Sequence, residues 1–492
     1  MLFSNLKLDD KKPIYLQIEN YIENLILNGL LPQDSKLPST RELSHILNVS
    51  RNTIVSTYDE LRSKGLIYSL AGKGTFVNSQ KVLKSKDWNV DWNKYENNYS
   101  ITANNLDIIK TEPKWTPEMI SFKSISPDGE LFDVEGFKKS FLHVISLESH
   151  KLLNYGYAQG YLPLIQYLKK YMMEKGNVTT GKDILITNGF TEAFDLILSA
   201  FTKEGDKIIC ENPTHNTSIK IMKTHNLDIL GVDIKENGLD FDMLSKKIEE
   251  NINSIKFAYI TPSYHNPTGR VMTPERRYEF YEILRENNIP IIEDGFVEEL
   301  LYTSSHIFPI SSLDNNNNGV IYIGSFSKIL FPGMRIGWIY ADKNVISKLE
   351  SVKRCRNIHT SFLDQAILCD YLKNDSFEKY MKKIKKVYGN KFNFAYECVE
   401  KYIPYEYIFG DGGLYLFVKL KNIDTRKLLD ECLKRNVMFM PGDLFFVNDN
   451  SNECDFNDDR KTTLRLAFSR LTMEQIEEGI KNIADIIRLI TS

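Results

Sequence analysis

The 492-residue sequence contains no run of about eighteen uncharged apolar residues, so no membrane-spanning helix is expected. Its first residues lack an apolar core followed by a cleavage site, which argues against a secretory signal. The six cysteines are scattered without a CxxC pair, which disfavours a disulfide framework and a zinc site. These absences together predict a cytoplasmic protein with reduced thiols, no bound metal and no contact with a membrane.

A large charge of either sign is also absent, because the formal net charge is only −3. The chain as a whole is therefore no polycation, and any binding to nucleic acid must come from a local basic patch. Hydrophobic residues make up 42% and charged residues 26%, which is the composition of a globular protein. The length exceeds that of one ordinary domain and predicts two or three.

Residues 10–78 show the pattern of three helices followed by a short hairpin. The stretch IYLQIENYIENLILNG repeats apolar residues at helical spacing, and Ser39 and Ser50 precede two further helical stretches as N-caps. Two β-prone runs then flank the stretch GKG, which is a hairpin signal. This order is that of a winged helix-turn-helix, whose recognition helix would begin near Ser50 and lie in the major groove of DNA.

The stretch LPSTRELSHILNVSRNTIVSTYDELRSKGLIYSLAGKGTFV resembles the DNA-binding domain of GntR-type bacterial repressors. Within it, residues 36–77 hold six basic and three acidic side chains, a modest excess that favours binding by two copies of the domain. Taken alone, any one of the arginines could equally be a solvated helix end. The resemblance implies double-stranded operator DNA as the partner, with these residues as DNA contacts or wing tip: Arg41, Arg51, Asn52, Thr53, Lys73 and Gly74.

Residues 79–115 are polar and irregular, and they predict a linker. From residue 116 to residue 492, helical stretches alternate with short β-branched runs such as DILIT, DKIIC, KFAYI and VIYIG. Such alternation predicts an α/β domain with a mostly parallel sheet and helices on its faces.

Lys328 lies in the apolar stretch SFSKILFPGMRIGW, where a buried ammonium must be paired or lose its charge. One explanation is a surface loop that happens to be basic; the other is a lysine that holds pyridoxal phosphate. Besides the lysine, that cofactor needs a carboxylate for its pyridine nitrogen, a donor to its phenolic oxygen and a cup for its phosphate. Asp294 ends the strand PIIED, at the strand end where α/β folds place ligands.

The remaining groups are spread along the same part of the chain. Asn266 lies in the turn TPSYHNPTG and can donate its amide to a phenolate. Gly189 stands between a strand and a helix, so that the helix N-terminus can receive a phosphate. Ser325, Ser327 and Arg335 flank the lysine with hydroxyl and guanidinium groups. A lone aspartate after a strand, or a lone NPTG, is more often a simple turn, so the joint order of the groups carries the prediction.

This order resembles fold-type I aminotransferases of the class I/II group, from about residue 155 to residue 470. The resemblance implies pyridoxal 5'-phosphate as cofactor and a smaller C-terminal α+β subdomain. It implies Lys328 as the Schiff-base lysine and, in an enzyme, as the acid/base that moves the substrate proton. Asp294 would then partner the pyridine nitrogen, and Asn266 the phenolic oxygen. The phosphate would be held by Gly189, Phe190, Thr191, Ser325, Ser327 and Arg335.

Two further segments resemble parts of the same family. TTLRLAFSR is similar to the segment whose arginine clamps a substrate carboxylate, which implies Arg465 as a bidentate partner of a substrate or effector. NYGYAQGYLPL is similar to the segment whose tyrosine crosses the dimer interface to the partner's phosphate, which implies Tyr155 for that role.

Two places depart from the family pattern. A tyrosine usually follows the strand aspartate by two or three residues, whereas Phe296 and Val297 stand there and offer no donor to the phenolic oxygen. Where the family usually stacks an aromatic ring on the cofactor, this sequence has His215, which can stack but can also titrate. Both departures leave cofactor binding expected and argue against efficient transamination.

A GntR-type winged helix joined by a linker to an aminotransferase-like domain is similar to the MocR family of bacterial regulators. The resemblance implies a homodimeric transcription factor that senses pyridoxal phosphate, an amino acid or amine, or both. The alternative is an active aminotransferase, converting an amino acid to a 2-oxo acid, that also binds DNA. A third interpretation makes the aminotransferase-like domain a dimerisation scaffold alone, and the complete set of cofactor residues argues against it.

Overall fold

The computed structural model describes residues 3, 6–9, 11–78, 89–107, 116–235, 238–300, 302, 307–315, 317–447 and 459–491. The chain forms two compact units, Met1–Glu96 and Asn97–Ser492. Parts of the predicted linker, residues 79–88 and 108–115, lie outside the described residues, as does Cys454. The five described cysteines are all free.

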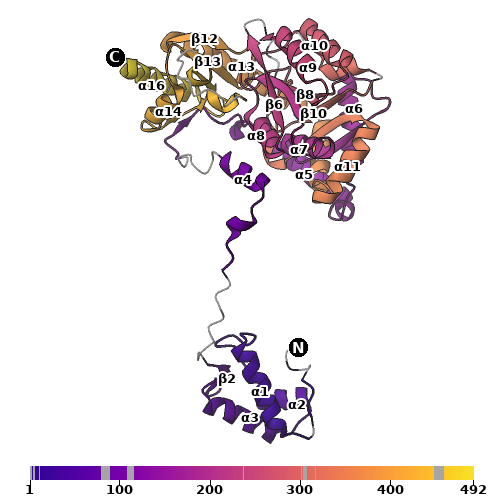
Figure 1. The fold of residues 1–492 in the computed structure, drawn as a ribbon, viewed down its shortest axis with the longest axis vertical. Helices are drawn as coiled ribbons and strands as arrows, with labels where there is room; N and C mark the ends of the chain where they lie inside the picture. The colour runs from indigo at the N-terminus through magenta and orange to yellow at the C-terminus, as the bar shows by residue number, and fades with distance from the viewer. Residues whose placement is uncertain are drawn as a thin grey trace. The chain divides into compact units, whose positions relative to one another are not determined.

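The first unit consists of three helices and a hairpin (Figure 1). Its strands pair antiparallel, so that Leu70 faces Gly74 across the turn. The winged helix-turn-helix prediction is therefore confirmed. The elements are α1 (Ile14–Leu27), α2 (Thr40–Leu47), α3 (Arg51–Ser63), β1 (Ile67–Leu70) and β2 (Gly74–Val77).

Local hydrogen bonds explain where α2 and α3 begin and end. The Ser39 side chain accepts from the backbone N–H of Glu42, and the Glu42 carboxylate accepts from the backbone N–H of Ser39, which together form a capping box. Asn48 ends α2 in a left-handed conformation with φ of 52°, and Ser50 then caps α3 by accepting from the N–H of Thr53. The tight turn between the two helices follows from these caps.

The second unit is built on an eight-stranded sheet. In spatial order its strands are β4 (Lys182–Thr187), β11 (Gly337–Asp342), β10 (Val320–Ser325), β9 (Ile291–Asp294), β8 (Ile255–Ile260), β5 (Lys207–Asn212), β6 (Asp228–Lys235) and β7 (Gly238–Leu239). The strands from β10 to β6 in this order run parallel to one another. Strand β11 is antiparallel to both of its neighbours, and β7 is antiparallel to β6.

Helices cover both faces of this sheet, as the alternating pattern predicted (Figure 1). On one face pack α7 (Phe190–Phe201), α8 (Asn216–Thr224) and α11 (Lys343–Asn357). On the other pack α6 (Leu162–Glu174), α9 (Phe241–Asn251) and α10 (Pro274–Glu286). Along the chain, α5 (Val134–Leu152) and α12 (Phe362–Lys373) pack against each other.

A smaller C-terminal subdomain surrounds an antiparallel sheet, which confirms the predicted α+β part. Its strands are β12 (Tyr405–Phe409), β13 (Tyr415–Leu420), β16 (Thr463–Ala467) and β15 (Met440–Pro441), with β3 (Ile120–Ser121) paired to β14 (Val437–Met438). Its helices are α13 (Asp375–Tyr402), α14 (Thr425–Leu433), α15 (Asp459–Thr462) and α16 (Met473–Thr491). Throughout the described ranges, no helix is both long and apolar enough to cross a bilayer.

Part of the predicted linker is a helix that packs on the second unit. This helix, α4 (Asn98–Asn105), lies against α8, and the ring of Tyr99 meets that of His225 edge-on with 6.2 Å between centroids. His225 in turn contacts Asp195 through Nε2 at 2.7 Å. The segment that leads from the first unit is thus attached to α8.

Candidate functional site

A cavity of about 130 Å³ lies at the carboxyl ends of β9 and β10, where ligands bind in open α/β sheets. Eight of the residues singled out from the sequence line it together. They are Phe190, Thr191, His215, Asp294, Ser325, Ser327, Lys328 and Arg335. Phe296 and Val297, at the places that depart from the family pattern, line it as well.

Asp294 and Lys328 are buried ionisable groups of opposite charge in this cavity. Burial raises the pKa of Asp294 to about 7, although Tyr259 lowers it by donating its hydroxyl to Oδ2 at 3.0 Å. Burial, together with the positive charges of Arg465 and Arg335, lowers the pKa of Lys328 to about 8. The Lys328 amine therefore reaches its neutral, nucleophilic form much closer to neutral pH than an exposed lysine does.

Hydroxyl, guanidinium and backbone amide groups form one end of the cavity. The Ser325 hydroxyl lies 2.9 Å from that of Ser327 and also accepts from the backbone N–H of Ser327 at 3.1 Å. The N-cap residue of α7 is Gly189, which has no side chain to cap the helix that begins at Phe190. These groups match the donors that a phosphate requires.

Gly189 permits the close approach of Arg335 to this helix terminus. Its φ is +80°, and a Cβ there would come within 2.7 Å of Arg335 Nη2. The same Nη2 donates to the backbone carbonyl of Asn188 at 3.1 Å. The backbone conformation therefore favours glycine at this position, and a side chain here would displace the Arg335 guanidinium.

Asn266 and Arg465 lie together but are not among the residues that line the 130 Å³ cavity. Arg465 donates from Nη1 to Asn266 Oδ1 at 2.8 Å and from Nη2 to the Lys123 carbonyl at 2.9 Å. Asn266 Nδ2 and Arg465 Nε are both buried, and neither has a hydrogen-bond partner among the described residues. Two buried donors left open in this way are costly unless a ligand accepts from them.

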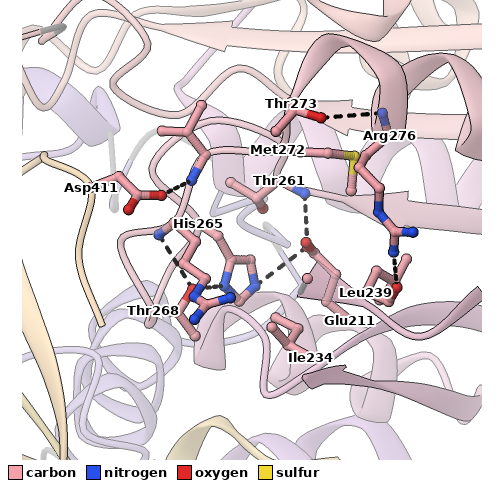
Figure 2. A pocket seen from close by; sticks show the side chains of 13 residues that line it. Glu211, Ile234, Leu239, Thr261, His265, Thr268, Met272, Thr273, Arg276 and Asp411 are labelled. Atoms are coloured by element: carbon pink, nitrogen blue, oxygen red, sulfur yellow. Dashed lines mark hydrogen bonds and ion pairs between the residues drawn. The ribbon is translucent and has the colours of Figure 1, made fainter. Parts of the chain in front are cut away.

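The turn that carries Asn266 is held from behind by two buried side chains, beside a separate cavity of about 350 Å³ (Figure 2). His265 bonds Thr268 through Nδ1 at 2.8 Å, and its Nε2 lies 3.3 Å from Glu211. Glu211 accepts from the backbone N–H of Thr261 at 2.9 Å, and burial raises the pKa of its carboxyl well above the usual range. This arrangement fixes the turn that carries Asn266.

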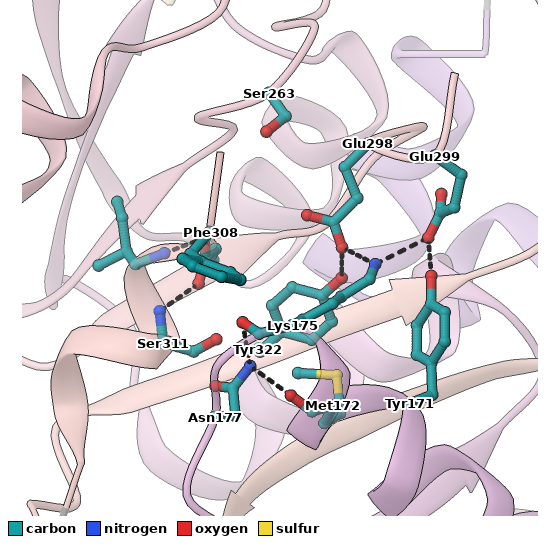
Figure 3. Close-up of polar contacts among 12 residues, drawn as sticks. Tyr171, Met172, Lys175, Asn177, Ser263, Glu298, Glu299, Phe308, Ser311 and Tyr322 are labelled. Atoms are coloured by element: carbon teal, nitrogen blue, oxygen red, sulfur yellow. Dashed lines mark hydrogen bonds and ion pairs between the residues drawn. The ribbon is translucent and has the colours of Figure 1, made fainter. Parts of the chain in front are cut away.

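The segment that follows Asp294 is anchored by a buried lysine (Figure 3). Lys175 contacts Glu298 and lies 2.9 Å from Glu299, while Tyr322 and Tyr171 donate their hydroxyls to the same two carboxylates. Burial alone would lower the pKa of Lys175, but the two glutamates outweigh burial and raise it. Phe296 and Val297 are thereby held at the cavity wall by a contact far from them in sequence.

Tyr155 lies away from the cavity on the surface of the single chain, with 80% of its surface exposed. Its ring meets His359 edge-on at 6.0 Å between centroids. It contributes nothing to the site of its own chain.

In the first unit, the residues predicted to contact DNA lie at helix starts and at the hairpin turn. Arg41, Arg51 and Asn52 are exposed, and Arg51 donates from Nε to Thr40 at 3.4 Å. Thr53 is half-buried and shares a hydrogen bond with the Ser50 hydroxyl. Lys73 is exposed in the turn before Gly74, whose φ of +125° requires glycine.

Sequence reasoning missed the groups that hold the site from outside the motifs. These groups are Tyr259, Lys175 and Glu298. The one sequence signal for any of them is the alternation of side chains along β8, which places Tyr259 on the same face of the sheet as Phe257. Within the described ranges, no group of three or more histidine, cysteine, aspartate or glutamate side chains is arranged to hold a metal ion.

Comparison with known proteins agrees with both halves of this description. Residues 117–483 match the family model of class I and II aminotransferases, and residues 14–77 match that of the gntR family of bacterial regulatory proteins. The chain is 31% identical to aromatic-amino-acid aminotransferase 1 of Thermococcus litoralis, over 76% of this chain and 89% of that protein. It is 26% identical to the uncharacterized HTH-type transcriptional regulator YdfD of Bacillus subtilis, over 100% of both chains.

A solved structure gives the same result for the second unit. The kynurenine aminotransferase of Pyrococcus horikoshii, solved in complex with PMP, matches with a TM-score of 0.73 and 27% identity. The match covers 84% of this chain and 100% of that one.

Replacing Lys175 tests the anchor of residues 295–299. Lys175→Ala leaves two buried glutamates without their cation, so we expect a loss of about 3–5 kcal/mol in the free energy of unfolding, measured by urea denaturation. Lys170→Ala is the matched control, because Lys170 is exposed near the end of α6, the helix that Lys175 directly follows, and its pair with Glu174 is exposed too. That variant should lose less than about 1 kcal/mol. Equal losses in the two variants would contradict the anchor.

Proposed function

Because the chain belongs to the class I and II aminotransferase family and is a GntR-type transcriptional regulator of the MocR architecture, we propose that its aminotransferase domain binds pyridoxal phosphate and senses an amino compound. The observation that carries the proposal is the convergence of Lys328, Asp294 and a phosphate cup in one cavity. The class of effector is inferred from the chemistry of the site.

The residues fit each part of pyridoxal phosphate. Asp294 supplies a buried carboxylate for the pyridine nitrogen, and the unpartnered Nδ2 of Asn266 supplies a donor for the phenolic oxygen. Ser325, Ser327, Arg335 and the N-terminus of α7 supply donors for the phosphate. PMP, the amine form of this cofactor, is bound in the solved aminotransferase from Pyrococcus horikoshii.

When bound, pyridoxal phosphate supplies an aldehyde carbon that amines attack and a ring that withdraws electrons from that carbon. Lys328 is suited to hold the aldehyde carbon, because its pKa of about 8 leaves a useful fraction of neutral amine near pH 7. Asp294, once ionised, keeps a proton on the pyridine nitrogen by charge attraction. An incoming amine would compete with Lys328 for the same carbon.

Arg465 gives the site its preference among amines. Its guanidinium is buried and has an open Nε, so a ligand carboxylate would find a charged donor there. The effector is therefore an amino acid or a related amine with a carboxylate. The second candidate function is an active aminotransferase. The presence of Lys328, Asp294, Asn266 and Arg465 supports it, whereas Phe296, which stands where a hydroxyl donor is usual, argues against it.

DNA recognition is assigned to the first unit. Arg51 and Asn52 stand exposed at the start of α3, the predicted recognition helix, and Arg41 stands exposed at the start of α2. Lys73 at the hairpin tip would contact the backbone phosphates. Binding to operator DNA would place the protein in the cytoplasm.

A homodimer is supported by apolar side chains that the single chain leaves in solvent. Leu147, Leu153, Tyr155 and Tyr157 follow one another at the end of α5 and are 69–80% exposed. A patch of this kind marks a surface that a partner covers. A second copy of the chain on this patch would bring Tyr155 to the neighbouring phosphate cup.

A route from the cofactor site to the DNA-binding unit is supported by α8. His215 lines the cavity and directly precedes α8, and the other end of α8 contacts Tyr99 of α4 through His225. A ligand that displaces His215 would shift a rigid helix on which the linker helix is seated.

Lys328→Ala should abolish covalent capture of pyridoxal phosphate while leaving the fold intact, because no other group in the cavity can bond its carbonyl carbon. Borohydride reduction followed by mass spectrometry of the intact chain measures the capture. Lys343→Ala, which changes an exposed lysine at the start of α11, should retain full capture. Capture that persists at the wild-type level in Lys328→Ala would refute the assignment.

Arg51→Ala should weaken operator binding by about 1–3 kcal/mol if the guanidinium reads a base. Fluorescence anisotropy at fixed salt gives the affinity. Arg62→Ala is the matched control on the same helix, because Arg62 is already bound to Asp59 and Ser69. An Arg51 variant no weaker than the Arg62 variant would count against α3 as the reading helix.

Tyr99→Ala should reduce the change in operator affinity that an amino acid causes, without altering cofactor capture or the affinity measured in the absence of effector. Tyr95→Ala, an exposed aromatic in the segment just before α4, should leave the response unchanged. A full response in the Tyr99 variant would exclude the α4–α8 contact from signalling.

A further inference from the structure

A chain of hydrogen bonds runs from Asp294 to His215 through the side chains of Tyr259 and Ser218. Tyr259 donates from Oη to Asp294 Oδ2 at 3.0 Å, and Ser218 donates from Oγ to Tyr259 Oη at 3.0 Å. The chain ends with Nδ1 of His215, 3.2 Å from Ser218 Oγ. Tyr259 and Ser218 are both fully buried, with relative exposures of 1% and 0%.

The number of protons in this chain fixes its direction. Each hydroxyl has a single hydrogen to donate, and an ionised Asp294 can only accept. Tyr259 must then donate to Asp294, and Ser218 must donate to Tyr259. The oxygen of Ser218 is left to accept, so His215 carries its proton on Nδ1 and its Nε2 is an acceptor.

An Asp294 that is protonated on Oδ2, the oxygen bonded to Tyr259, reverses every donor. Its own proton then goes to Tyr259, that of Tyr259 goes to Ser218, and that of Ser218 goes to Nδ1 of His215. The imidazole must then carry its proton on Nε2. That nitrogen has no partner among the described residues, and the ring that bears it lines the cofactor cavity.

We propose that Asp294, Tyr259, Ser218 and His215 form a proton wire, in which the charge of Asp294 decides whether His215 presents a hydrogen-bond acceptor or a donor to the cavity. The transfer is balanced: one proton binds at Nε2 of His215, the Nδ1 proton passes to Ser218, the Ser218 proton to Tyr259, and the Tyr259 proton to Asp294. His215, Ser218 and Tyr259 each gain one proton and lose one, and Asp294 gains one.

The ionisable groups around both ends are compatible with such a wire. The charges of Glu293, Glu298, Glu211 and Lys328 act on Asp294, and those of Lys328, Arg465 and His265 act on His215. Burial and the neighbouring positive charges lower the pKa of His215 to about 3, so the ring stays neutral while Asp294 titrates near pH 7. The change at His215 is therefore a change of tautomer and not of charge.

The wire gives Ser218 and Tyr259 the role of positioning residues, and it makes His215 a determinant of specificity. With a protonated cofactor nitrogen beside an ionised Asp294, Nε2 of His215 accepts, and ligands that offer a hydrogen to it are favoured. This inference deepens the proposed cofactor site, but it concerns side chains whose states are measured without cofactor.

Nitrogen-15 NMR of the full-length, cofactor-free protein with labelled histidine tests the wire. The two neutral tautomers differ in the shifts of their ring nitrogens, and His215→Gln assigns the signal. About two pH units above the pKa of Asp294 the Nδ1–H form is expected, and about two units below it the Nε2–H form. Tyr259→Phe and, independently, Ser218→Ala should each remove this pH response.

Thr261→Val is the matched control, because Thr261 Oγ1 donates to Tyr259 Oη at 3.5 Å but does not lie between Asp294 and His215; its response should equal that of the wild type. A single tautomer of His215 at both pH values overturns the proposal, as does a full response in both the Tyr259 and the Ser218 variants. Borohydride capture of pyridoxal phosphate, measured on the same samples, reports the cofactor site separately. Failure of the wire is therefore distinguishable from failure of cofactor binding.

Discussion

The burial of Asp294 at the carboxyl end of β9 is the constraint to which the rest of the site answers. A carboxylate out of water is unstable unless donors and opposite charge surround it. Tyr259 supplies the donor from the adjacent strand β8, and Lys328 supplies the charge from the loop after β10. The parallel order of β8, β9 and β10 brings all three groups to one edge of the sheet, so the cavity is a direct consequence of the sheet topology.

Contacts with other parts of the second unit hold the segments around this edge of the sheet in place. The segment after Asp294, which lines the cavity, is held by Lys175, and the separate turn that carries Asn266 is held by His265. Helix α8 connects two regions of this unit. His215, which directly precedes it, lines the cavity, and His225 at its other end contacts Tyr99 of α4. The proposed route from the cofactor site to the linker helix therefore runs through α8.

Much of this architecture follows from the sequence. Helix caps at Ser39 and Ser50 and the alternation of strands and helices predicted the fold, and the order of motifs gathered Asp294 and Lys328 in one cavity. The supporting partners could not be predicted in this way. Tyr259 is 35 residues from Asp294 and Lys175 is 123 residues from Glu298, and no local spacing rule links positions so far apart. Nor did composition reveal that residues 98–105, polar and weakly amphipathic, form a helix that packs on α8.

The central claim is that the aminotransferase domain senses and the winged helix responds. It is tested most directly by anisotropy titration of the pyridoxal phosphate-loaded protein on DNA from upstream of its own gene, with a panel of amino acids and with 2-oxo acid measured in the same samples. We expect one carboxylate-bearing amine to change operator affinity by about 5–150-fold, with little or no 2-oxo acid formed. An affinity that no amine alters, together with steady production of 2-oxo acid, would contradict it and identify an active aminotransferase instead.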